Sequence, residues 1–145
     1  MSEHTEQCAL MQWAALQDIA ELDLLHAIPN GGWRHAATAG RLRAEGVKPG
    51  VPDLCLPVPR GGYHGLYIEL KVGRNKPTAH QQAWIKALRD RGYRVEVCWG
   101  WEAARDVIEE YLRVKRPLTF YRAARGCLKL DRPAEELIRD VREAS

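Results

Sequence analysis

The stretch Leu66-Tyr67-Ile68-Glu69-Leu70-Lys71-Val72 alternates aliphatic with larger or polar side chains at a period of two, which predicts a β-strand. Its four aliphatic residues share one face. Successive side chains of a strand point to opposite faces, so Tyr67, Glu69 and Lys71 project together from the other face. The strand therefore presents a carboxylate and an ammonium group side by side.

A second carboxylate lies just upstream of this strand. Residues 48–53, Lys-Pro-Gly-Val-Pro-Asp, predict a loop that leads into a strand near residues 53 to 58. Pro52 suits the beginning of that strand, where a missing N–H is tolerated. A turn at residues 59–62, Pro-Arg-Gly-Gly, then connects the two strands. Asp53 and Glu69 can therefore meet across an antiparallel pair and chelate one metal ion.

The sequence after the Glu69 strand predicts a helical crossover. Thr78 with Gln81 three residues later forms a capping-box pattern, and the helix continues to Gly92. Residues 93 to 99 alternate again and predict a strand parallel to the Glu69 strand, as a helical connection requires. A further helix follows from about residue 101 to 112 and packs through Ala104, Val107, Ile108 and Tyr111.

The N-terminal part predicts two helices. The first runs from about Thr5 to His26, with Glu6 in its first turn; its apolar face recurs at spacings of three and four, at Ala9, Trp13, Leu16, Ala20 and Leu24. The second runs from about residue 35 to 45, and Gly46 ends it. The fold class is α/β, a small mixed β-sheet flanked by helices.

Length and composition suit one domain with a real core, since the chain has 145 residues and is 46% hydrophobic. We expect one folded domain over residues 1–112 and a C-terminal extension over residues 113–145. The extension is weakly patterned, and its role is not indicated by the sequence. Residues 133 to 142 can form a helix that begins at a proline, so the extension is partly helical.

Two compositional features exclude other classes of protein. The N-terminus lacks a secretion signal, and no apolar run approaches the ~18 residues that a membrane span needs, so we expect a cytoplasmic protein without membrane contact. The four cysteines show no C-x-x-C pair and are expected to be reduced core thiols, and the five histidines lack metal-ligand spacing. The cysteines are Cys8, Cys55, Cys98 and Cys127.

Charge is distributed unevenly. Residues 1 to 33 contain no Lys or Arg, whereas residues 34 to 94 contain twelve basic and four acidic residues. This basic stretch suits a polyanion, although solvated helix faces give similar counts. Lys48, Arg74 and Lys76 flank the strands that carry Asp53 and Glu69, in Gly- or Pro-containing loops, where they are candidates for phosphate contacts or are simply solvated.

The five tryptophans fall into two groups. Trp33, in a turn beside Gly32 and Arg34, is a candidate for substrate contact. The others sit at apolar positions of their elements, which favours core packing over base stacking; they are Trp13, Trp84, Trp99 and Trp101.

The pairing of two carboxylates with an ammonium group suits phosphodiester hydrolysis. That reaction needs an in-line water, charge neutralisation on the phosphoryl oxygens and help for the leaving oxygen, all of which carboxylate-held Mg²⁺ supplies. Lys71 can orient the water or stabilise developing charge. Glu-x-Lys or Pro-Asp alone is a weak signal, because exposed strands and turns carry both by chance; their order and placement together carry the prediction.

The motif resembles that of the PD-(D/E)XK nuclease superfamily, whose core is restriction-endonuclease-like. It consists of Pro52-Asp53, a gap of fifteen residues, and Glu69-Leu70-Lys71. Four segments narrow the resemblance to the VRR-NUC branch, over residues from about 4 to 112. These segments are Gly46 to Leu54, Tyr67 to Lys71, Thr78 to Trp84, and Gly92-Tyr93.

The resemblance implies a metal-dependent, structure-specific DNA endonuclease that uses Mg²⁺ or Mn²⁺. It implies that an N-terminal acid completes the metal site, best matched by Glu6 with Glu3 as the rival. It implies that the backbone carbonyl of Leu70 touches the metal and that Gln81 is catalytic. This chain has the size of stand-alone phage and bacterial members of the family. The resemblance implies that such members are homodimers that cut branched DNA such as Holliday junctions, whereas domains fused to larger proteins serve crosslink repair.

Two alternatives belong to other function classes. One is a non-catalytic nucleic-acid-binding module on a nuclease fold, against which the intact Asp53, Glu69 and Lys71 argue. The other is an interaction subunit whose basic face meets an acidic protein, which predicts no nucleic-acid binding.

Overall fold

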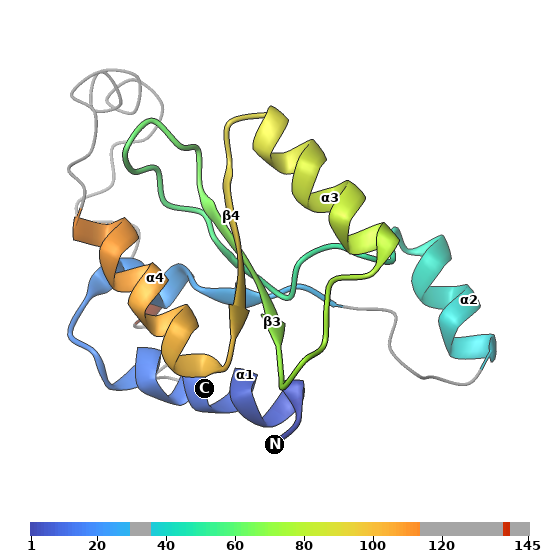
Figure 1. Ribbon diagram of the computed structural model, residues 1–145, viewed down its shortest axis with the longest axis horizontal. Coiled ribbons are helices and arrows are strands. Elements are labelled where there is room, and N and C mark those ends of the chain that lie inside the picture. Colours follow the sequence, from blue (N-terminus) through green and yellow to red (C-terminus); the bar gives the residue numbers. More distant parts are fainter. Residues whose placement is uncertain (30–35, 114–137, 140–145) are drawn as a thin grey trace.

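The computed structural model describes residues 1–29, 36–113 and 138–139, and its centre is a four-stranded sheet (Figure 1). Strands β1 and β2 pair antiparallel, as do β2 and β3, whereas β3 and β4 pair parallel. The predicted mixed sheet and the parallel crossover strand are confirmed. The strands are β1 (His26–Ala27), β2 (Leu54–Leu56), β3 (Leu66–Lys71) and β4 (Arg94–Trp99), in that spatial order.

Helices cover both faces of the sheet, which confirms the predicted α/β class. The aliphatic face of β3 packs with α1 and α4 in the larger hydrophobic core, and α3 packs against Tyr67, Val95 and Val97 in a smaller one. The helices are α1 (Glu3–Leu16), α2 (Ala36–Ala44), α3 (Ala79–Asp90) and α4 (Trp101–Arg113), with a 3₁₀ helix η1 (Ala20–Leu24) after α1.

Helix α1 is shorter than the sequence predicts and buries a different face. It ends at Leu16 rather than near residue 26, because Gln17 takes extended dihedrals and its side-chain amide donates to the carbonyl of Trp13 at 3.1 Å. The buried residues are Glu6, Leu10 and Ala14, whereas Leu16 is 84% exposed. Apolar residues occur on all sides of this helix, so two stripes compete in the sequence and the pattern alone selected the wrong one.

Helix α2 forms close to its predicted bounds and stands away from the sheet (Figure 1). None of its residues is buried. Gly46 follows it with φ +97°, a conformation that glycine adopts without strain, and the N–H of Val47 returns to the carbonyl of Leu42 at 2.9 Å.

The elements around β3 follow their predictions, although β2 is shorter than the predicted span of residues 53 to 58. The capping box is present, since Gln81 N–H donates to Thr78 Oγ1 and Thr78 N–H donates to Gln81 Oε1. Helix α4 buries Ala104, Ile108 and Tyr111, as predicted.

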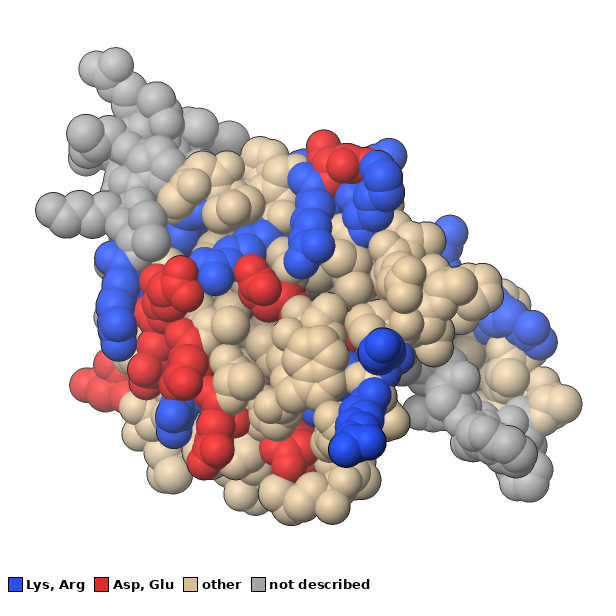
Figure 2. Space-filling model, in the orientation of Figure 1, with Lys and Arg blue, Asp and Glu red and all other residues tan. Residues whose placement is uncertain are grey.

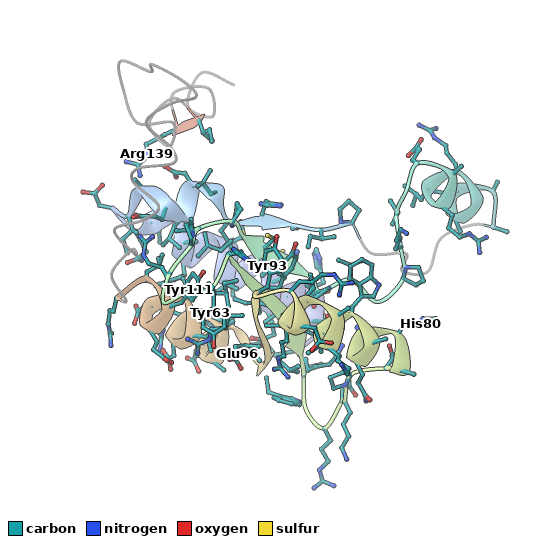
Figure 3. The ribbon with its side chains drawn as sticks, turned by 90° about the horizontal axis from the view of Figure 1, so that it is seen from above. Tyr63, His80, Tyr93, Glu96, Tyr111 and Arg139 are labelled. Carbon is teal, nitrogen blue, oxygen red and sulfur yellow. The ribbon has the colours of Figure 1, made fainter. Side chains whose placement is uncertain are left out.

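Gly50 fixes the loop that delivers Asp53. Its φ is +86°, and a Cβ there would lie 2.6 Å from the carbonyl carbon of His80, at the start of α3. This loop and α3 are therefore in backbone contact. His80 is labelled in Figure 3, at the end of the molecule where α3 begins.

We expect Gly50→Ala to lower the free energy of unfolding by at least about 2 kcal/mol, since it adds a steric clash to the strain of positive φ. Gly46→Ala is the matched control: its φ is also positive, but nothing lies within 4 Å of the added Cβ, so only about 1 kcal/mol is lost. Urea unfolding of both variants measures the difference. Equal losses would show that the contact with His80 does not constrain the loop.

Three of the four cysteines are described, and all three are free thiols. Cys55 and Cys98 are buried as predicted, but Cys8 is exposed, so its assignment to the core is wrong. Some predictions lie outside the described residues: those for Trp33, for Cys127 and for most of the 113–145 extension. Of the helix predicted over residues 133–142, only residues 138–139 are described. Among the helices that are described, none combines the length and apolar character needed to cross a membrane.

Candidate active site

The predicted carboxylates meet at the carboxyl end of β3. The register pairs Leu54 with Ile68, so the preceding residue of the chain, Asp53, lies opposite Glu69. Asp53 Oδ2 accepts a hydrogen bond from the backbone N–H of Leu70 at 2.8 Å. The Asp53 carboxylate is therefore tied directly to the strand that carries Glu69.

The two oxygens of Glu69 have different surroundings. Oε1 accepts from the ammonium of Lys71 at 2.8 Å and from the side-chain amide of Gln81 at 2.5 Å. Oε2 is also buried, yet it has no hydrogen-bond partner among the described residues. A buried oxygen without a partner is costly and marks a place for water or a cation.

Burial opposes the charge of Glu69. It raises the pKa of this carboxyl to about 7, and the nearby Asp53 charge adds to the rise, while the hydrogen bond from Lys71 partly offsets it. A cation at Oε2 would favour the ionised form and so counter this rise.

Lys71 is only 4% exposed, but its ammonium is directed at carboxylates rather than into the apolar core. Besides Glu69, it contacts Glu3 Oε1 at 3.5 Å. Burial alone lowers the pKa of Lys71, but Glu69, Glu3 and Asp53 outweigh it and the net pKa is raised. Lys71 is therefore a permanent cation at neutral pH.

Gln81 connects α3 to the site. Its side-chain oxygen completes the capping box, and its side-chain nitrogen donates to Glu69. The same residue thus begins the helix and holds the Glu69 carboxylate in one orientation.

The N-terminal acid that contacts Lys71 is Glu3, which the sequence analysis gave as the rival of Glu6 for the metal site. Glu3 begins α1, and this end of the helix lies beneath the tip of β3 (Figure 1). Glu6 has another contact: it is 5% exposed, and its Oε2 accepts from the backbone N–H of Trp101 at 2.7 Å. Glu6 therefore caps the first turn of α4, a position where helix N–H groups lack partners. Sequence spacing gave no sign of this contact, because the two residues are 95 positions apart.

The residues fit a divalent ion held by few protein ligands. In the part of the chain that the structure describes, no three acidic, histidine or cysteine side chains converge to hold a metal together. Glu6 is thus not gathered with Asp53 and Glu69. The fit rests on two groups, the Glu69 Oε2 without a partner and the backbone carbonyl of Leu70. The N–H of Leu70 donates to Asp53, and the N–H and C=O of a strand residue point to the same side, so this carbonyl faces the side on which Asp53 lies. Mg²⁺ commonly takes one or two carboxylates and fills its remaining positions with water.

The three predicted phosphate-binding residues are exposed. Arg74 and Lys76 lie in the loop between β3 and α3, and Lys48 lies in the loop before β2. In Figure 2, Lys and Arg side chains border the loop between β3 and α3, whereas acidic side chains gather over α4. The basic loops therefore lie on the side of the site away from α4.

Two hollows lie away from these residues. One of about 370 Å³ is lined by residues that include Trp13, Arg60 and Ile108, and one of about 380 Å³ is lined by residues of α3 that include Trp84. Neither is lined by a predicted site residue, so the site is not one of these hollows.

Comparison with known proteins finds a family model and a solved structure that are similar to this chain. The family model described as VRR-NUC domain matches residues 1–102. A solved structure described as a VRR_NUC domain protein is 32% identical, with a TM-score of 0.69 over 80% of this chain and 92% of that chain. No curated protein matches the chain.

Proposed function

Because the chain belongs to the VRR-NUC domain family and therefore carries a nuclease-type domain, we propose that it is a metal-dependent DNA endonuclease. Asp53, Glu69 and Lys71 hydrolyse the phosphodiester bond, with Gln81 in support. The observation that carries the proposal is the state of Glu69: two donors hold its Oε1, while its buried Oε2 has no partner among the described residues. One oxygen is thus positioned and the other is left for a ligand.

Asp53, Glu69 and the carbonyl of Leu70 would hold Mg²⁺ or Mn²⁺. A bound ion supplies charge neutralisation at the phosphoryl oxygens and a water of lowered pKa. Asp53 is anchored through Leu70 and Glu69 through Gln81, so both carboxylates are oriented before substrate binds. Such preorganisation avoids reorganisation during the reaction.

Lys71 acts as a cation rather than as a base. Its raised pKa keeps the ammonium charged, so it orients the attacking water or stabilises the charge that develops on the phosphoryl group. Because the ammonium also holds Glu69 Oε1, the same side chain positions the metal-binding carboxylate.

Branched DNA, such as a Holliday junction, is the proposed substrate, and a homodimer the proposed assembly. The exposed Lys48, Arg74 and Lys76 support DNA binding through phosphate contacts. Resolving a four-way junction takes two matched cuts, which a two-fold dimer delivers. Both ideas otherwise depend on family resemblance, as does a role in DNA repair.

The test is a cleavage panel of linear duplex, single strand, flap, splayed arm and four-way junction, run with Mg²⁺, with Mn²⁺ and with a chelator. We expect metal-dependent cleavage with a preference for branched substrates, and sedimentation at micromolar concentration to give a dimer mass. Salt-sensitive DNA binding without cleavage in either metal would favour the non-catalytic binding module. Absence of DNA binding would favour the protein-interaction subunit.

A further inference from the structure

Trp99 lies beside the candidate active site, although its apolar position in the sequence predicts a core residue. It is the last residue of β4 and pairs in parallel register with Lys71. Neighbouring strands are about 4.8 Å apart, and paired residues of parallel strands share a face. Trp99 therefore stands next to Lys71 on the face that carries Glu69. Its side chain is 48% exposed, so the assignment to the core is wrong.

The indole is held in place by the neighbouring loop. Its Nε1 donates to the carbonyl of Asn75 at 2.9 Å. Asn75 lies between Arg74 and Lys76, two exposed cations. The structure thus combines a fixed aromatic side chain, two candidate phosphate-binding residues and the catalytic lysine at one end of the sheet.

Exposure of a large aromatic side chain is uncommon in the described part of this protein. Within this part, the exposed residues with a large aromatic side chain are Tyr63 and Trp99. Tyr63 precedes the start of β3, at the opposite end of the strand from Lys71, and Figure 3 shows it well separated from His80 at the start of α3. Trp99 is therefore the exposed aromatic residue at the end of the sheet where the candidate chemistry lies.

We propose that Trp99 stacks on an unpaired nucleobase of the DNA strand next to the phosphodiester bond that is cut. This inference rests on the proposed nuclease function and deepens it. An aromatic face stacks on any base, whereas the bases within a duplex already have both faces covered by their neighbours. Only an unpaired or displaced base can reach Trp99, so this residue favours substrates in which a base at the cut is unpaired or displaced from its stack, as at a branch point.

The test compares Trp99→Ala, Trp99→Phe and the control Tyr63→Ala by fluorescence anisotropy without metal. The probes are a flap with unpaired nucleotides and a fully paired blunt duplex. We expect Trp99→Ala to bind the flap roughly 10-fold more weakly and the duplex nearly as well as wild type. Trp99→Phe keeps a ring but loses the bond to Asn75, so it should retain most flap affinity. Tyr63→Ala should match wild type.

An abasic scan of the flap locates the base. Wild type should lose about 10-fold in affinity when one particular base is removed, whereas Trp99→Ala should be insensitive at that position, because either change removes the same contact. Equal loss in Trp99→Phe and Trp99→Ala would assign the effect to loop anchoring and overturn stacking. Equal losses of affinity for the flap and the duplex would also overturn stacking. A changed mass of Trp99→Ala in sedimentation would overturn it as well, because it would place the residue between protein copies.

The binding and cleavage readouts separate this proposal from the one on which it rests. If wild type cuts no substrate yet shows the base-specific loss, the nuclease proposal fails and stacking stands. If wild type cuts DNA but the abasic scan shows no position at which Trp99→Ala differs, stacking fails alone. Thermal unfolding of each variant checks that the fold is kept.

Discussion

Lys71→Met is expected to slow metal-dependent DNA cleavage by about 10²- to 10³-fold, the usual loss when one preorganised donor to a developing charge is removed. Methionine fills much of the space of the buried side chain but carries no charge. Glu69 Oε1 then keeps Gln81 as its remaining observed donor, so the carboxylate loses both an electrostatic partner and half of its positioning contacts. Single-turnover cleavage of the best substrate from the panel measures the loss.

Lys86→Met is the matched control, because it removes a lysine from α3 that is 78% exposed and pairs with Asp90 at 2.6 Å. Exposed ion pairs contribute little, so this variant should cut and unfold like wild type. DNA affinity of Lys71→Met should fall far less than its cleavage rate. A Lys71→Met rate within about threefold of wild type would remove Lys71 from the mechanism, whatever the control shows.

The parts of the site that the sequence could predict are those with a local signature. The alternation of β3 placed Glu69 and Lys71 on one face, and the structure joins them at 2.8 Å. The capping-box spacing predicted the start of α3, which positions Gln81. The turn signal at residues 59–62 predicted that the two strands are neighbours, so Asp53 and Glu69 were expected to meet, whereas the register that sets them opposite each other comes from the structure.

The parts that the sequence could not predict depend on contacts between distant residues. Glu6 caps α4 across 95 positions, and Glu3 reaches Lys71 across 68, so no local spacing distinguishes their roles. The apolar run around Leu10 fits several helix faces, and only packing against the sheet selects one. Trp99 alternates like a core residue, yet it lies at the end of an edge strand, where α3 no longer covers it.

Asp53→Asn is expected to abolish metal binding and to cut cleavage at least about 10³-fold, because each of the two carboxylates proposed to bind the metal would contribute several kcal/mol of charge stabilisation. The amide oxygen can still accept from the N–H of Leu70, so the fold is kept. Without metal, this variant should unfold close to wild type, since it loses both the repulsion between Asp53 and Glu69 and the attraction between Asp53 and Lys71, which oppose each other. Asp53→Ala should instead lose about 1 to 3 kcal/mol, because it leaves the buried Leu70 N–H without its acceptor.

Thermal unfolding with and without Mn²⁺ separates the two roles of Asp53 without any assay of activity. A ligand that binds only the folded state raises the unfolding temperature, so wild type should gain stability from Mn²⁺ and Asp53→Asn should not. Calorimetric titration with Mn²⁺ should give one binding isotherm for wild type and none for the variant. Wild-type Mn²⁺ affinity in Asp53→Asn would mean that Glu69 holds the ion with ligands other than Asp53. The pairing of these two carboxylates across β2 and β3 would then not be the basis of catalysis.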